Sequence, residues 1–255
     1  MREGFLRRTL VVIPAWNEIE CVASTVREWL DIGVGRVRVV DNGSTDGTEA
    51  TARAAGAEVL MEPIRGYGAA AWRGLQDWPA GFDWVLFSSA DGSDMLTIAE
   101  LAAWQAAVDA GGDLILGNRL NSAELRKRLK WVQRFGNSLS CAVIAAGWGR
   151  SFQDMAALRL VRHGALGRMQ LQDRGFGWNV EMQVRALELE MQVIEIPVVF
   201  RLRRAGESKI SGSWAGSWRA GKGILRMLWL LWQLRTTGRS APSAPKPVAF
   251  VRHDN

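Results

Sequence analysis

The chain has 255 residues, of which 48% are apolar and 23% are charged, and its formal net charge is +6. This composition excludes a disordered chain, and the length is enough for one large domain with a sizeable core. The basic excess suits phosphate-bearing ligands or an anionic membrane surface. The two cysteines, Cys21 and Cys141, lie far apart, which excludes a zinc spacing or a disulfide framework and favours a reducing compartment.

Short apolar runs alternate with amphipathic segments through the first half of the chain. Strands are predicted at 9–14, 36–41, 57–61, 84–89 and 113–118. Helices are predicted at about 18–31, 46–55, 69–77 and 97–110, and capping-box pairs mark three of their starts: Asn17 with Glu20, Asp46 with Glu49, and Thr97 with Glu100. The alternation predicts an α/β fold, with a mostly parallel sheet covered by helices on both faces.

A polar cluster follows each of these five strands: "AWNE", "DNGSTDG", "PIRGYG", "SADGSD" and "NR". In such sheets ligands bind beyond the carboxyl ends of the strands, so the five clusters predict one binding site. The chain has neither a GxGxxG fingerprint nor a Walker A loop, which argues against dehydrogenases and P-loop NTPases.

The pattern changes after residue 118. We expect a basic loop at 119–130, helices at 131–147, 178–190 and 214–235, and strands at 156–161 and 193–203. Pro197 favours an edge position for the last strand. The predicted organisation is a single domain over 1–235, with a nucleotide-binding half at about 8–118, an acceptor half at about 119–235, and a disordered Pro- and Ser-rich tail at 236–255.

Several polar residues allow both a functional and a structural interpretation. Asp41 ends a strand and could bind a base or a ribose, whereas Asp46 is expected only to cap a helix. For Asp154 the alternatives are a general base and a structural ion pair, and for Glu181 the structural role is favoured. The arginines at 201, 203 and 204 and Lys209 form a basic run that could bind phosphate or simply be solvated.

The segments "VVIPAWNE", "VVDNGSTDGT", "RGYGAA", "ADGSD", "GNR", "QRFGN" and "FRLRRAGESKISG", in this order, resemble a family 2 glycosyltransferase of the Rossmann-like GT-A fold. The resemblance covers about residues 8–235 and is strongest to the dolichyl- or polyprenyl-phosphate sugar transferase branch. It implies inverting transfer of a sugar from a nucleotide-sugar, helped by Mg²⁺ or Mn²⁺.

The resemblance also implies roles for individual residues. Asp91 would be the metal ligand, and Asp154 would lie near the reacting centre. The nucleoside would be held by Pro14, Trp16, Glu18 and Asp41, and Gly66 and Gly68 would line the nucleoside site. The diphosphate would be bound by Arg201, Arg203 and Lys209. The acceptor phosphate would be bound by Arg119, Arg134 and Ser138.

The metal motif departs from the family pattern, because Ser89 stands where the first acid of an Asp-x-Asp motif is usual. The Ser89 hydroxyl and Asp91, with Asp94 acting through a water molecule, could suffice to hold a metal ion. Mg²⁺ takes one or two carboxylates plus substrate phosphates. One alternative is that the basic residues neutralise the charge of the diphosphate in place of a metal. The other is a protein that binds the nucleotide-sugar without transferring the sugar. A second departure, Ala157 and Leu158 in "FQDMAALRL", affects the expected acceptor pocket.

The apolar segment 223–234 is interrupted by Arg226 and is too short to span a bilayer. One helical face carries the residues Trp214, Trp218, Gly221, Leu225, Leu228 and Trp232. We therefore expect an amphipathic helix at the membrane interface, and the alternative is a helix packed on the domain or on a dimer partner. The predicted protein is a cytoplasmic, peripherally attached enzyme that moves a sugar from a UDP- or GDP-sugar to a polyprenyl phosphate or similar acceptor. The alternative is a nucleotide-sugar-binding protein with weak or no transfer activity, and no nucleic-acid partner is expected.

Overall fold

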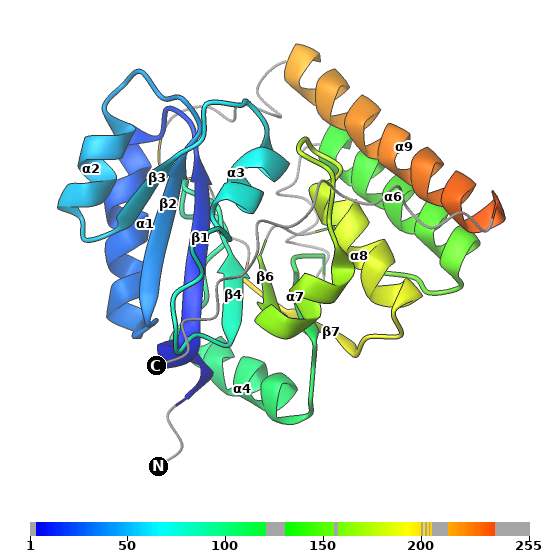
Figure 1. Ribbon diagram of the computed structural model, residues 1–255, viewed down its shortest axis with the longest axis horizontal. Coiled ribbons are helices and arrows are strands. Elements are labelled where there is room, and N and C mark those ends of the chain that lie inside the picture. Colours follow the sequence, from blue (N-terminus) through cyan, green and yellow to red (C-terminus); the bar gives the residue numbers. More distant parts are fainter. Residues whose placement is uncertain are drawn as a thin grey trace.

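The computed structural model describes residues 4–120, 131–155, 158–199, 201, 203, 205 and 214–237. A seven-stranded sheet in the order β3-β2-β1-β4-β6-β5-β7 runs through this part of the chain (Figure 1). The strands are β1 (Thr9–Ala15), β2 (Arg36–Asp41), β3 (Glu58–Met61), β4 (Trp84–Phe87), β5 (Leu114–Asn118), β6 (Arg159–Arg162) and β7 (Val193–Pro197). Only β6 runs antiparallel to its neighbours in this sheet, so the predicted mostly parallel sheet is confirmed.

The helices pack on both faces of the sheet, as predicted. They are α1 (Ile19–Ile32), α2 (Thr48–Ala54), α3 (Tyr67–Arg73), α4 (Leu101–Asp109), α6 (Trp131–Trp148), α7 (His163–Met169), α8 (Trp178–Glu188) and α9 (Trp214–Thr237), with 3₁₀ turns at Phe5–Arg8 and Ile98–Glu100. Side chains along β1 point alternately to the two faces of the sheet, and each face has its own hydrophobic core. Val11 and Ile13 pack in the core formed with α1, α2 and α4. Leu10 and Val12 pack in the core formed with α3, α6, α7, α8 and α9. Burial on both sides explains why the strands read as continuous apolar runs.

Most element boundaries lie within a few residues of the predicted ones, but the strand predicted at 193–203 ends at Pro197, and the helix predicted at 69–77 is found at Tyr67–Arg73. The strand at 36–41 and the helix beginning at Trp131 were predicted at those positions, and β7 lies at an edge of the sheet, as Pro197 indicated. Helix α7 was missed, because its seven residues follow β6 directly and carry too few turns for a clear helical period. The loop predicted at 119–130 lies outside the described residues from 121 onward. Of the disordered tail predicted at 236–255, Thr236 and Thr237 are instead the last residues of α9, and 238–255 lie outside the described residues.

Two of the three predicted capping boxes are wrong, and the reason is tertiary. Thr97 and Glu100 do form one, with the Thr97 backbone N–H and hydroxyl donating to the Glu100 carboxylate at 2.7 and 2.8 Å. Asn17 instead adopts a left-handed φ of 52° and accepts a hydrogen bond from the Thr45 N–H across the site. Asp46 accepts from the N–H groups of both Ile19 and Thr48, so its predicted structural role is confirmed without Glu49, which pairs with Arg53.

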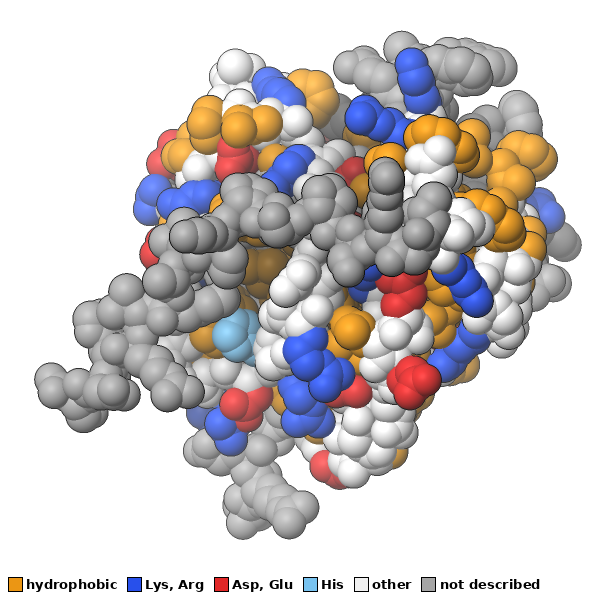
Figure 2. All heavy atoms as spheres, turned by 45° about the vertical axis from the view of Figure 1, so that its right-hand side comes forward, with side chains coloured by type: hydrophobic (Ala, Val, Ile, Leu, Met, Phe, Trp, Pro, Cys, Tyr) orange, Lys and Arg blue, Asp and Glu red, His pale blue; other side chains and the backbone are white. Residues whose placement is uncertain are grey.

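Helices α6 and α9 lie side by side and form an outer layer over α8 (Figure 1). The predicted apolar face of α9 needs a correction, because Leu228 is buried with Met227 and Leu231 in the core, while Trp229 is exposed. Hydrophobic side chains gather at the upper right of Figure 2, where these two helices lie. Among the described residues, no helix combines the length and the apolar character needed to cross a bilayer.

Candidate active site

The loop after β4 carries the residues of the predicted metal motif, and hydrogen bonds within the loop fix their places. The Ser88 side chain is buried and donates to the Asp94 backbone oxygen at 2.7 Å. The Ser89 hydroxyl donates to the Asp94 carboxylate, and the N–H and hydroxyl of Ser93 donate to Asp91 Oδ1 at 3.0 and 2.7 Å. Burial raises the pKa of Asp94 above its ordinary value. Asp94 is thus a buried structural acid, and Asp91 is the partly exposed one.

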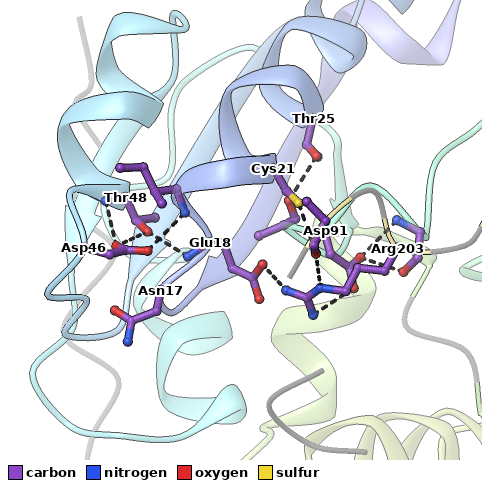
Figure 3. Close-up of polar contacts among 12 residues, drawn as sticks. Asn17, Glu18, Cys21, Thr25, Asp46, Thr48, Asp91 and Arg203 are labelled. Carbon is purple, nitrogen blue, oxygen red and sulfur yellow. Dashed lines mark hydrogen bonds and ion pairs between the residues drawn. The ribbon is translucent and has the colours of Figure 1, made fainter. Parts of the chain in front are cut away.

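Arg203 lies between two carboxylates that belong to different strand ends. Its Nη2 pairs with Glu18, which precedes α1, and its Nη1 lies 3.5 Å from Asp91 Oδ2 (Figure 3). Burial opposes the protonated form, but Glu18 and then Asp91 outweigh it, so the pKa of Arg203 is raised. The structure therefore brings two predicted site residues, Glu18 and Asp91, to the guanidinium group of a third, Arg203.

The residues of this loop suit a divalent cation held jointly with a substrate. Within the described residues, Asp91 Oδ2 has one polar contact, at 3.5 Å with Arg203, whereas Asp91 Oδ1 is held by Ser93 and Asp94 by Ser89. No group of three histidine, cysteine or acidic side chains placed to hold a metal occurs in the described ranges. One carboxylate with phosphate oxygens and water is a ligand set that Mg²⁺ accepts, so the donor set fits a cation brought in with a diphosphate.

The predicted nucleoside residues surround the ends of β1 and β2. Asp41 is 1% exposed; its Oδ1 accepts from the Ser44 N–H at 2.7 Å, and its Oδ2 has no hydrogen-bond partner in the described part of the chain. A buried carboxylate oxygen without a partner is costly unless a ligand completes it. Pro14 is half-buried, and Trp16 is exposed with the Arg65 guanidinium 4.2 Å above its ring. Sequence reasoning missed Arg65; the basic residue within "PIRGYG" was its only signal.

Gly66 and Gly68 allow a close approach of two backbone segments. A Cβ added to Gly66, whose φ is 156°, would lie 2.1 Å from the Arg174 carbonyl oxygen, and one added to Gly68 would lie 2.5 Å from the Asp173 carbonyl oxygen. The N–H groups of Gly68 and Ala69 donate to this same segment at 2.9 Å. The two glycines thus join α3 to the segment 173–175, and their predicted place beside the nucleoside stays a prediction.

Asp154 and Arg119 form a tightly bound pair near Asp94 of the loop after β4. Asp154 is 1% exposed, and its Oδ2 accepts from the Arg119 N–H at 2.8 Å and Nε at 2.9 Å, while its Oδ1 accepts from Nη2 at 3.0 Å. Burial opposes the charge of Arg119, but Asp154 outweighs it and raises the pKa of the guanidinium. Asp94 lies close enough to interact electrostatically with both. Both oxygens of Asp154 are therefore engaged by a cation.

A second arginine, Arg159 on β6, lies beside this pair and is fully buried. Its Nη1 donates to the Asn179 backbone oxygen at 3.1 Å, and burial lowers the pKa of its guanidinium to about 10. Glu181 accepts backbone hydrogen bonds from Gln172 and Asp173, so the structural role favoured for it is confirmed.

The other predicted phosphate-binding residues are spread more widely. Arg134 and Ser138 lie exposed on α6, whereas Arg119 is committed to Asp154. Arg201 pairs with Glu28 of α1, and Lys209 lies outside the described residues. Asn137 links α6 to the site, since it accepts from the Met155 N–H at 2.7 Å and contacts the Gln153 carbonyl oxygen at 3.4 Å.

Comparisons with known proteins agree with this geometry. The chain is 32% identical to the polyprenol monophosphomannose synthase of Mycolicibacterium smegmatis, over 81% of this chain and 82% of that protein. It is 31% identical to the undecaprenyl-phosphate mannosyltransferase of Micrococcus luteus, over 82% and 90%. The structure of glucosyl-3-phosphoglycerate synthase from Mycobacterium tuberculosis shares the GT-A fold, with a TM-score of 0.65 at 21% identity over 88% of this chain and 80% of that one.

The model of the glycosyl transferase family 2 matches residues 10–174. This range holds Asp41, Asp91 and Asp154, and it ends at the segment on which Gly66 and Gly68 pack. The match favours the enzyme over the binding protein without transfer activity. The chain belongs to glycosyl transferase family 2, within its polyprenyl-phosphate sugar transferase branch, and is a nucleotide-sugar-dependent glycosyltransferase.

Proposed function

We propose that this chain moves a sugar from a UDP- or GDP-sugar to a polyprenyl phosphate or a similar lipid-linked acceptor, with inversion at the anomeric carbon. The observation that carries the choice of acceptor is the Asp154–Arg119 pair. Both oxygens of this buried carboxylate already accept hydrogen bonds from a guanidinium group, so it is not disposed to take a proton from a hydroxyl. An acceptor phosphate is ionised and needs no general base.

The course of the reaction follows from the charge of the acceptor, because a phosphate is already ionised and a hydroxyl is not. An acceptor phosphate oxygen attacks the anomeric carbon and forms the new bond, and the bond from that carbon to the diphosphate breaks. The nucleoside diphosphate leaves with the electron pair, and no proton has to be removed from the acceptor. The chain's task is then to orient two anions and to stabilise the charge that develops on the leaving group.

The donor side of the site supports this assignment. A ribose hydroxyl or a base would complete the unpartnered Oδ2 of Asp41, and the exposed ring of Trp16 offers a stacking surface beside Pro14 and Glu18. Arg203 is the first residue we assign to the diphosphate, because it stands between two carboxylates that an incoming anion can replace. Arg201, and Lys209 from outside the described residues, are proposed to assist it.

A divalent cation, Mg²⁺ or Mn²⁺, would be held by Asp91 and by the phosphates of the donor, where it would add positive charge near the leaving group. Glucosyl-3-phosphoglycerate synthase, which shares the fold, has been solved with Mn²⁺ and UDP-glucose. The lipid acceptor places the enzyme at a membrane surface, and we propose that it is a cytoplasmic protein attached peripherally there.

The test is transfer from radiolabelled UDP- and GDP-sugars by the full chain, with polyprenyl phosphate and the matching polyprenol compared as acceptors. We expect a labelled lipid with the phosphate alone, with the opposite anomeric configuration to the donor by NMR. Transfer to the polyprenol at an equal rate would refute the phosphate acceptor, and an absence of nucleotide binding would refute the donor site.

A further inference from the structure

Four large apolar side chains lie exposed on the outer layer of the molecule. Phe135 of α6 is 65% exposed, and Leu225, Trp229 and Trp232 of α9 are 48%, 59% and 42% exposed. The opposite side of α9 packs into the core through Met227, Leu228 and Leu231. Each α9 residue of the exposed set is three or four positions from the next, so the three form one stripe along the helix. We call these four residues the outer apolar face.

The two helices that carry this face contribute charges of a single sign. Neither α6 nor α9 contains an aspartate or a glutamate. Lys222 and Arg226 are exposed beside the α9 stripe, and Arg134 is exposed next to Phe135. On these two adjacent helices, exposed basic side chains therefore flank the exposed apolar ones, and neither helix contributes an acid.

We propose that the outer apolar face docks this enzyme on an anionic lipid bilayer. Tryptophan, leucine and phenylalanine side chains enter the boundary between headgroups and acyl chains, and the flanking basic residues meet the lipid phosphates. Pairing with a second copy of this chain is disfavoured, because it would bring Lys222 and Arg226 against like charges. The inference rests on the proposed function in one respect, since a lipid-linked acceptor requires the enzyme at a membrane.

The same surface connects directly to the acceptor side of the site. Arg134 and Ser138 are exposed on α6, the helix that carries Phe135. Asn137, between them, binds the Met155 N–H at 2.7 Å, next to the Asp154–Arg119 pair. Docking through this face would thus hold the acceptor end of the site at the headgroup level, where the phosphate of a lipid-linked acceptor lies.

The experiment is flotation of the full chain with vesicles that contain no polyprenyl phosphate, made of phosphatidylcholine alone or with phosphatidylglycerol added. We expect binding to the anionic vesicles, which salt weakens. The variant Leu225→Glu/Trp229→Glu should lose it. Lys222→Glu/Arg226→Glu should weaken it by at least about fivefold for each residue, the effect of roughly one charge at such a surface.

The matched control is Ile98→Glu, which also places an acid at an exposed apolar position, 82% exposed and on the turn before α4. It should bind vesicles like the unaltered chain, and all variants should keep their UDP or GDP affinity, which reports the fold and the donor site. Three results would overturn the proposal: no vesicle binding by the unaltered chain, an equal loss in Ile98→Glu, or a Trp229-dependent dimer without vesicle binding. Failure of nucleotide binding with intact vesicle binding would instead refute the proposed function alone.

Discussion

The Asp154–Arg119 pair makes a prediction about stability and catalysis together. Asp154→Ala leaves Arg119 without two hydrogen bonds from its guanidinium group and one from its backbone N–H, in a site where the side chains of Asp154 and Arg119 are 1% and 17% exposed. Breaking a buried pair by removing one partner costs about 3–5 kcal/mol, and the residual exposure of Arg119 favours the lower end. For a chain of this length the melting temperature should fall by roughly 6–12 °C.

Thermal unfolding and a double-mutant cycle with Arg119→Met measure this effect. The matched control is Glu49→Ala, which removes an exposed ion pair of similar length, 3.0 Å to Arg53 against 2.9 Å from Arg119 to Asp154, and should cost at most about 0.5 kcal/mol. Equal losses in Asp154→Ala and Glu49→Ala would refute the view that the buried pair stabilises the fold.

The conservative variant separates the two roles of Asp154. In Asp154→Asn the side chain can still accept a hydrogen bond from Arg119, so transfer to a phosphate acceptor should fall by less than about tenfold, against the 10²–10⁴-fold that loss of a general base brings. A larger loss, with donor binding intact, would show that Asp154 acts as a base and would favour a hydroxyl acceptor.

Three further predictions follow from the loop after β4 and from α3. Ser89→Asp adds a carboxylate beside Asp91 and should raise the Mn²⁺ enhancement of nucleotide binding about tenfold in calorimetry; an unchanged enhancement would contradict the assignment of the metal to this loop. Asp94 has a raised pKa because it is buried, so its contribution to stability is present below the ordinary Asp value and is lost as the pH rises through the folded value. Asp94→Asn should therefore remove the decline in unfolding free energy between these two pKa values, and a pH profile identical to that of the unaltered chain would contradict this. Gly66→Ala brings a Cβ to 2.1 Å from the Arg174 carbonyl oxygen and should destabilise the fold by about 2–4 kcal/mol. The control Gly167→Ala, which has open space in α7, should stabilise the fold by about 0.5–1 kcal/mol. Unchanged stability of Gly66→Ala would show that α3 and the segment around Arg174 can separate.

The sequence by itself determined the fold, because the signals for it are local. Each buried strand reads as an apolar run bounded by turn residues, and the helical periods between them are long enough to recognise, so the parallel sheet and the site at its carboxyl edge could be predicted. The motif order also identified the family. The antiparallel β6 could not be read from periodicity, since its run looks like any other buried strand and its direction depends on the pairing with β4 and β5.

The tertiary structure decided which charges meet. Arg119 and Asp154 are separated by 35 positions, and Arg203 is 185 positions from Glu18, so no local pattern could show that these pairs form. The same holds for Asn17, which turns away from its expected cap because Thr45 lies opposite it. On α9 the period was visible, but the choice between Leu228 inside and Trp229 outside depended on where α6 and α8 pack. The sequence specifies the elements and the groups they carry, and contacts between distant segments determine which of those groups remain available to a ligand.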